Sequence, residues 1–425
     1  MSPRLSRRQT ERRGLRLWPV GPVLVLAFTT AVIAAAAVFY AGWNLLDVHE
    51  LKPERRIDSK TLFDLVKLAF GVVAGAGALV ALVVAYRRQR VDEDGALRDA
   101  TRLHTERFTA AVSQLGDASE AVRLGGVHAL AGLADDAPSR QLRQTCIDVL
   151  CAYLRLPYIA EADLPANEAG ARHAYLALRE VRHTIIRLIR DHLRLPPEHH
   201  HSWQGHGLDF TGVTFDGGDF SAATFSGGMV NFSAATFSGG MVNFSGATFS
   251  GGTVNFHAAT FSGGTVSFSA ATFSGGTVNF YAATFSGGTV GFSHATFTGG
   301  KVDFSHATFS SGTVHFYSAT FSGATVHFYS ATFSGGTVHF RAAGFSGSSV
   351  TFGARFSGGT VHFHSATFTG GRVGFLGAAF SGGTVDFSHA HAVGIAFPIG
   401  LLPAAGTPMP PGLTVPAGWL PPPSP

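Results

Sequence analysis

Polar and apolar positions alternate with a period of two in the second half of the chain. In Val254-Asn255-Phe256 and again in Ala259-Thr260-Phe261, two apolar residues flank one polar residue. Residues two apart share a face of a strand, whereas residues on one face of a helix are three or four apart. The pattern therefore predicts short strands that each turn a small residue and a Phe inward and one polar side chain outward.

These strands belong to a regular repeat. The Phe spacing is five residues from Phe210 to Phe225 and then alternates between seven and five. Fourteen twelve-residue units run from Ala223 to His389, and one of them, Ala343–Gly353, is a residue short. A fixed period of this kind is typical of a solenoid. Gly-Gly or Ser-Gly after every second Phe predicts corners at which φ is positive.

The repeat allows two sizes of coil. Four sides of 5, 7, 5 and 7 residues give a turn of 24 residues, and the alternative is a flattened turn of twelve. Two Phe with Val and Ala are hard to fit inside a twelve-residue turn, so we favour 24. The expected inward stack contains Phe225, Phe232, Phe237, Phe244, Phe249, Phe256, Phe261, Phe268, Phe273, Phe280, Phe285 and Phe292.

Two long apolar segments near the N-terminus predict a two-helix transmembrane hairpin over residues 17–86. The first, 17–46, is uncharged, and the second, 62–86, carries only Asp64 and Lys67 near its start. About 20 apolar residues span a bilayer as a helix. Arginines lie before the first segment and after the second, which places both termini in the cytoplasm of a multi-pass protein of the cell membrane. The alternatives are a cleaved signal peptide for the first segment and a buried soluble helix for the second.

Helical spacing continues through residues 93–115, 119–134, 138–155 and about 167–195. The second and third of these segments are similar to a single HEAT-like unit, for which Ser119 is a candidate N-cap. One helical pair cannot bury both of its faces, so we expect it to pack on the last helix and the first coil of the solenoid.

The expected domains are a basic cytoplasmic N-terminus (1–16), the transmembrane hairpin (17–86), an α-helical domain (87–205), the β-solenoid (206–390) and a Pro-rich tail (391–425). The tail has ten Pro, and we expect its apolar start to cap the last coil and the rest to be extended and disordered.

Composition changes this picture little. The chain has 53 Gly, 37 Phe and 14% charged residues, and its net charge of +4 comes from the arginines that flank the apolar segments. The array from 207 to 390 has five acidic residues against four basic ones, which argues against nucleic-acid binding and against imitation of a phosphate backbone. The acidic ones are Asp209, Asp216, Asp219, Asp303 and Asp386, and the basic ones are Lys301, Arg341, Arg355 and Arg372.

Residues that carry chemistry are few. Cys146 and Cys151 are expected to be buried free thiols rather than a metal or redox pair. The run His199–His201, with His206 close by, is expected to be a solvated loop, and a metal site is the alternative. The chain contains no Gly-Lys-Thr phosphate loop, His-Glu-x-x-His or Gly-x-Ser-x-Gly, so we expect no enzyme activity and no cofactor.

The outward positions of the longer sides change along the array. Early units have Asn at this position (Asn231, Asn243 and Asn255), and later ones have His315, His327, His339 and His362. We interpret them as ladders in which neighbouring coils satisfy each other, and the alternative is a binding stripe that becomes protonatable toward its end.

Residues 207–390 resemble the pentapeptide-repeat family in its Phe-rich form. The segment Ser202–Phe220, the helical stretch 122–134 and the two apolar segments extend the resemblance to actinobacterial membrane-anchored members. The resemblance implies an all-β, right-handed quadrilateral β-helix, here preceded by an α-helical domain and the two-helix hairpin. The array departs from the family pattern in the two-residue insert, typically Gly-Thr, before each Val.

These observations lead to two hypotheses of function. The first is a non-enzymatic, membrane-tethered scaffold whose solenoid binds an unidentified protein partner, with the lipid bilayer as its other partner and no role for nucleic acid. The alternative is a regulator or inhibitor of a specific enzyme such as a DNA topoisomerase (gyrase). Near-neutral charge on the array favours the first.

Overall fold

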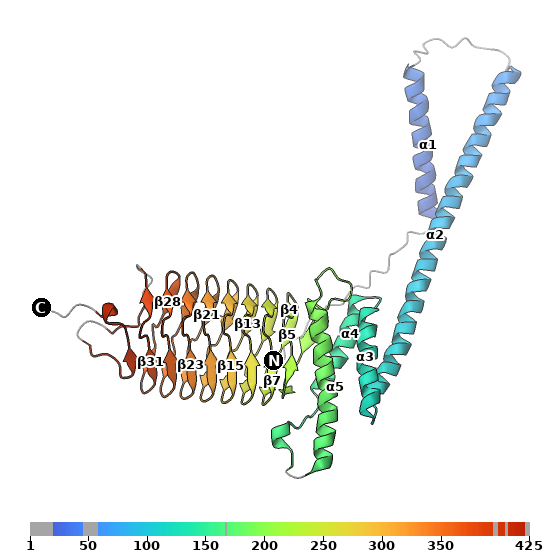
Figure 1. Cartoon of the computed structure of the whole chain (residues 1–425). Helices are drawn as coiled ribbons and strands as arrows, with labels where there is room; N and C mark the ends of the chain where they lie inside the picture. The colour runs from blue at the N-terminus through green and yellow to red at the C-terminus, as the bar shows by residue number, and fades with distance from the viewer. Residues whose placement is uncertain (1–19, 46–57, 166–167, 394–397, 404–406, 421–425) are drawn as a thin grey trace, which may run out of the picture. The chain divides into compact units, whose positions relative to one another are not determined.

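The computed structural model describes residues 20–45, 58–165, 168–393, 398–403 and 407–420 (Figure 1). The chain divides into two units, Met1–Thr101 and Arg102–Pro425, which are described separately.

The first unit consists of helix α1 (Val20–Leu45) and most of helix α2 (Ser59–Leu115). An 18-residue window of α2 has a mean hydropathy of 2.5 and none of it is buried. Among the described residues α2 is the one helix that is long and apolar enough to cross a membrane, so the structure supplies one candidate for the two expected spans. Helix α2 also continues through residue 87, where the sequence had suggested a domain boundary.

The helical part of the second unit contains α3 (Glu120–Asp135), α4 (Arg140–Leu154), the short 3-10 helix η1 (Glu161–Asp163) and α5 (Ala169–Arg194). Ser139 caps α4, since its hydroxyl accepts the Leu142 N–H at 3.3 Å. Ser119 occupies the N-cap position of α3, but its side chain makes no capping bond. Helices α3 and α4 bury their apolar faces against each other and against α5.

The solenoid consists of four parallel sheets, and each sheet forms one of its four sides. Sheet A contains β1 (Leu208–Asp209), β5 (Met229–Asn231), β9 (Thr253–Asn255), β13 (Thr277–Asn279), β17 (Lys301–Asp303), β21 (Thr325–His327), β25 (Ser349–Thr351) and β29 (Arg372–Gly374). Sheet B contains β2 (Thr214–Phe215), β6 (Thr236–Phe237), β10 (Thr260–Phe261), β14 (Thr284–Phe285), β18 (Thr308–Phe309), β22 (Thr332–Phe333), β26 (Arg355–Phe356) and β30 (Ala379–Phe380).

Sheet C contains β3 (Gly218–Asp219), β7 (Met241–Asn243), β11 (Thr265–Ser267), β15 (Thr289–Gly291), β19 (Thr313–His315), β23 (Thr337–His339), β27 (Thr360–His362), β31 (Thr384–Asp386) and β33 (Leu413–Thr414). Sheet D contains β4 (Thr224–Phe225), β8 (Thr248–Phe249), β12 (Thr272–Phe273), β16 (Thr296–Phe297), β20 (Thr320–Phe321), β24 (Gly344–Phe345), β28 (Thr367–Phe368) and β32 (His391–Ala392). The chain visits the sheets in the order A, B, C, D, so A and C are opposite sides.

The strand register confirms the 24-residue turn and excludes the twelve-residue one. Phe261 pairs with Phe285, 24 residues later. The first coil is shorter, because Leu208 pairs with Val230. A second exception is the short unit, where Phe333 pairs with Phe356.

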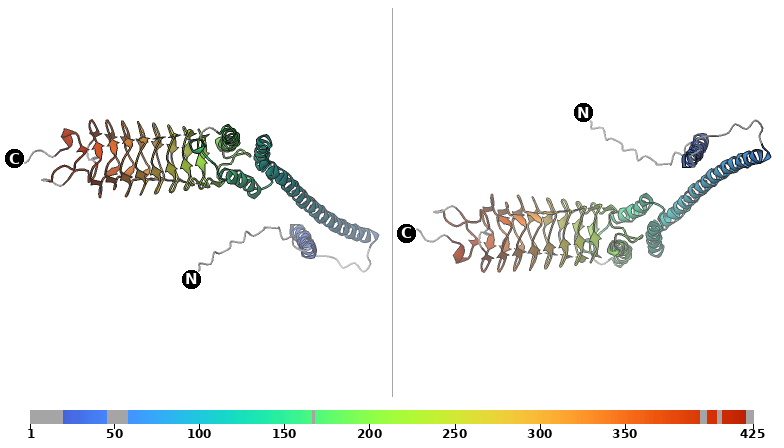
Figure 2. Two further views of the ribbon diagram at one scale, coloured as in Figure 1. Left: turned by 90° about the horizontal axis from the view of Figure 1, so that it is seen from below. Right: turned by 90° about the horizontal axis from the view of Figure 1, so that it is seen from above.

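Stacked phenylalanines fill the interior of the solenoid. All twelve residues of the expected inward stack are buried. Rings of successive coils stack nearly parallel, as in Phe273–Phe297 with 4.6 Å between centroids and 4° between planes. Rings on opposite sides of the interior meet edge to face, as in Phe268–Phe280 at 6.0 Å and 86°. The edge-to-face geometry suits the quadrupole of an aromatic ring. Figure 2 shows the resulting row of evenly stacked coils.

Two kinds of corner bend the coil. The expected glycine corners have positive φ, for example 67° at Gly252. The second kind lies two residues after the Phe that follows a strand of sheet A or C, and it places non-glycine residues in the left-handed region, as at Ala258 and Ala270 with φ of 54° and 55°. The sequence pattern gave no sign of this second class.

The Pro-rich tail differs from the expectation for residues 407–420. Strand β33 pairs with β31 in sheet C, with Leu413 opposite Val385. Trp419 is buried, with its ring 5.6 Å from that of Phe387 and 5.9 Å from that of Phe368. An open last coil would expose these Phe rings and unpaired strand groups, so this part of the tail caps the solenoid instead of lying extended.

Candidate interaction surfaces

Three imidazoles form a column on sheet C. The ring of His339 stacks on His315 at 5.3 Å and on His362 at 5.0 Å, with interplanar angles of 18° and 11°. Beyond them, His362 Nδ1 lies 3.7 Å from a carboxylate oxygen of Asp386. We call His315, His339 and His362 the imidazole column.

The fourth predicted member, His327, is not part of this column. It lies in sheet A, paired with Asp303 on one side and Thr351 on the other. The reason is the turn of 24 residues: twelve-residue units alternate between opposite sides, so His315 and His339 share a side while His327 does not. The asparagines divide in the same way, and Asn279 Nδ2 donates to Asn255 Oδ1 at 3.0 Å along sheet A.

Two rings of the imidazole column, those of His315 and His339, lie in surroundings that disfavour protonation. Burial lowers the pKa of His315. Burial, together with the nearby His362, His315 and Arg341, lowers the pKa of His339 to about 4. Protonation of His339 on this side therefore requires acid conditions.

A second surface follows the corner between sheets A and B. It consists of His257, Tyr281, His306 and Tyr329, whose successive ring centroids are 5.7, 5.0 and 6.4 Å apart. Tyr281 is 38% exposed and Tyr329 is 59% exposed. We call these four residues the aromatic corner. Three of them directly follow a Phe of the repeat, and the fourth, His306, lies one place further on. Only the 24-residue turn shows that they are neighbours.

A polar junction joins the helical part to the first coil. Asp216 is buried and accepts hydrogen bonds from the hydroxyls of Tyr158 and Tyr175, each at 2.6 Å. Burial opposes the ionisation of Asp216, but His183 and the two tyrosine hydroxyls outweigh it and lower its pKa to about 2. Arg182, also buried, donates to the carbonyl oxygens of Leu154 and Thr214 at 2.7 Å. The hydrogen bonds of Asp216 and Arg182 thus join the helical part to the first coil.

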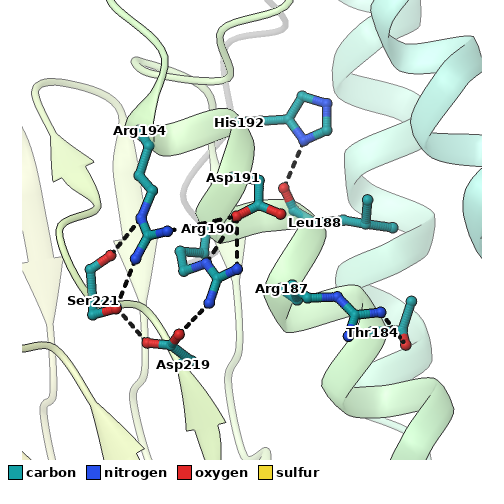
Figure 3. A network of polar contacts seen from close by, with 9 residues as sticks. All are labelled: Thr184, Arg187, Leu188, Arg190, Asp191, His192, Arg194, Asp219 and Ser221. Carbon is teal, nitrogen blue, oxygen red and sulfur yellow. Dashed lines mark hydrogen bonds and ion pairs between the residues drawn. The ribbon is translucent and has the colours of Figure 1, made fainter.

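Further along α5, arginines contact the coil edge (Figure 3). Arg190 is paired with both Asp191 and Asp219. Arg194 Nε donates to the Ser221 carbonyl oxygen at 2.8 Å.

The remaining candidate residues show no metal geometry. The described part of the chain contains no group of three His, Cys, Asp or Glu side chains that could hold a metal ion. His199 and His200 are exposed, whereas His206 is buried beside Gln144, 3.0 Å from its Oε1, so His206 differs from the solvated loop expected for it. Both cysteines are buried and free, and burial raises the pKa of the Cys146 thiol to about 11.

Part of the repeat array matches a known protein family. Residues 210–260 match the family model described as Pentapeptide repeats (9 copies). No curated protein matches the chain. The chain thus contains pentapeptide repeats, and in the structure the matched residues form the first coils of the four-sided solenoid.

Proposed function

We propose that this protein is a non-enzymatic scaffold, tethered to the cell membrane, whose solenoid binds a protein partner through the aromatic corner. The observation that carries the proposal is the exposure of tyrosine rings along one edge of a rigid, nearly neutral array. Aromatic residues are enriched at the centres of protein interfaces, where they bury much area at a small cost in side-chain entropy. Near-neutral charge does not favour the alternative of an enzyme inhibitor that imitates DNA.

The membrane tether of this proposal rests on α2. Leu68, Phe70 and Val73 are 69, 71 and 68% exposed. Exposed apolar side chains at this density are costly in water, and a hydrocarbon environment would remove that cost. With α1 as the other span, the tether would be a hairpin with both termini in the cytoplasm.

The repeat itself supplies the variants for a test. Ser233 and Ser305 occupy the positions at the corner after sheet A that correspond to Tyr281 and Tyr329, so Tyr281→Ser and Tyr329→Ser introduce a residue that this corner already accepts. Tyr317→Ser is the matched control, because Tyr317 lies at the corner after sheet C, where Ser293 and Ser388 are its equivalents.

The experiment is a proximity-labelling and pull-down comparison with the full chain in membranes. We expect a reproducible protein partner that the double variant Tyr281→Ser/Tyr329→Ser loses and the Tyr317→Ser variant retains. A partner retained by the double variant would contradict the aromatic corner as the binding surface, and the absence of any specific partner would contradict the scaffold.

A further inference from the structure

A cationic cavity of about 400 Å³ lies between α5 and the first two coils of the solenoid. Helix α5 contributes four basic residues to the lining of this cavity, namely Arg179, His183, Arg187 and Arg190. The first two coils contribute the opposite wall, which consists of Gly217, Gly218, Asp219, Met241 and Asn243. The four basic residues are spaced by four, four and three positions, which places them on one face of the helix.

The first coil is built to admit α5 at this point. Phe215 and Phe220 are five positions apart, whereas in the next coil Phe237 and Phe244 are seven positions apart. In the shorter side, Gly217 has a φ of 146°, and a Cβ there would lie 3.1 Å from His183 Cε1. Because this side of the coil is two residues shorter and Gly217 has no side chain, the basic face of α5 has space to lie against the coil.

The cavity has more positive charge than its own carboxylate neutralises. Its lining has three arginines and one aspartate, and Arg190 is also paired with Asp191 outside the lining, so among the described residues Arg179 and Arg187 are the two arginines of the cavity whose charge no carboxylate neutralises. The carboxylate of Asp219 already pairs with Arg190 and accepts the Ser221 N–H at 2.9 Å. Within the described ranges, Arg179 and Arg187 form no ion pair, and Arg187 donates to the Thr184 hydroxyl at 3.2 Å.

Two donors at the cavity are buried and unsatisfied. Arg179 Nε and His183 Nε2 have no hydrogen-bond partner among the described residues. The nearest Asp216 oxygen is 3.8 Å from His183 Nε2, which is an electrostatic contact beyond hydrogen-bond distance. A buried donor without a partner is costly, and a ligand oxygen would remove the cost.

We propose that this cavity binds a phosphoryl group, either as free phosphate or as a phosphate monoester. A phosphate monoester carries a charge of about −1.5 to −2 at pH 7 and three acceptor oxygens, which matches the charge excess and the unsatisfied donors. The planar fork of arginine suits a phosphate oxygen pair. An adjoining cavity of about 320 Å³ shares Arg179 with this one and is also lined by the carboxylates of Glu161 and Asp216. It contains Ser238, whose buried hydroxyl has no hydrogen-bond partner in the described part of the chain, so it offers room for an esterified part that carries no negative charge.

The test is calorimetric titration of the full chain in detergent micelles with inorganic phosphate. We expect saturable binding that Arg187→Gln weakens about tenfold, the effect of losing one charge-assisted hydrogen bond. Arg187 is exposed, so this substitution leaves the fold intact, and Arg179→Gln is the second variant. Arg355→Gln, which removes the same charge from an exposed position in sheet B, should leave binding unchanged.

A second arm identifies the source of the phosphoryl group. Mixed micelles with phosphatidic acid are compared with mixed micelles of phosphatidylcholine. If phosphatidic acid competes with inorganic phosphate and phosphatidylcholine does not, the ligand is a lipid headgroup. If phosphate binds and phosphatidic acid does not compete with it, the ligand is soluble. No saturable heat with either probe, or equal weakening by Arg187→Gln and Arg355→Gln, would overturn the proposal. Neither outcome depends on the protein partner proposed above.

Discussion

At the scale of single residues, the least expected feature is the left-handed backbone at alanine. Ala270 has a φ of 55°, and its methyl group is strained against its own backbone in this region. Its N–H donates to the Ser293 carbonyl oxygen of the next coil at 2.8 Å, so the strained conformation is held by inter-coil pairing. Gly246 occupies the equivalent position in the preceding coil with a φ of 67°.

Neighbouring alanines should therefore respond oppositely to glycine. Ala270→Gly removes the left-handed strain, and we expect it to leave the free energy of unfolding unchanged or to raise it by up to about 1 kcal/mol. Ala271→Gly removes a fully buried methyl group and should lower the local free energy of unfolding by about 1–2 kcal/mol. Hydrogen exchange of amides in the coils around residues 246–294 measures both. Equal destabilisation would mean that the corner is not strained.

At the scale of elements, the imidazole column makes the later coils sensitive to acid. The pKa of His339 is about 4 in the folded chain, below its ordinary value of 6.5. The folded state thus binds fewer protons than the unfolded state between these values. The stability that depends on neutral His339 is complete above pH 6.5 and is lost as the pH falls toward 4. The facing groups are His315, His362 and Arg341, all able to repel a new positive charge, with Asp386 at the far end near His362.

We therefore expect amides of the coils around residues 313–363 to lose protection between pH 6.5 and 4, while earlier coils lose less. His339→Asn should flatten this pH dependence, because Asn cannot titrate and Asn243 occupies the equivalent position in sheet C. His327→Asn, on the opposite side, is the control. An unchanged pH profile in His339→Asn would show that the column does not cause the acid sensitivity.

Sequence periodicity predicted the sides and contents of the coil, because strand alternation determines which residues face inward. The 24-residue turn also implies that His315 and His339 share a side and that His327 lies on the opposite one, because outward residues 24 positions apart are neighbours. Backbone conformation at Ala270 could not be predicted, since alternation carries no information on φ. The cap formed by Trp419 and the cavity beside Gly217 could not be predicted either, because both depend on contacts between distant segments.

At the scale of the whole molecule, tethering would determine where the solenoid acts. The arginines before residue 17 and the group Arg87, Arg88 and Arg90 flank the apolar segments, while the segment between them, 47–61, has no net positive charge. Positive residues near span ends remain on the cytoplasmic side. A solenoid that follows an even number of spans would then face the same compartment as the N-terminus.

The topology follows as the final prediction. Reporter fusions that are active only in the cytoplasm or only outside it should be placed after residue 55 and after residue 425. We expect opposite compartments for the two sites, with residue 425 in the cytoplasm, because the proposed hairpin would put two spans between the N-terminus and the solenoid. Replacing Arg87, Arg88 and Arg90 with Gln should weaken this orientation, whereas Arg98→Gln, farther from the apolar segment, should not. The same compartment for residues 55 and 425 would mean that α2 does not span the bilayer, and its exposed Leu, Phe and Val side chains would then require a protein partner instead of lipid.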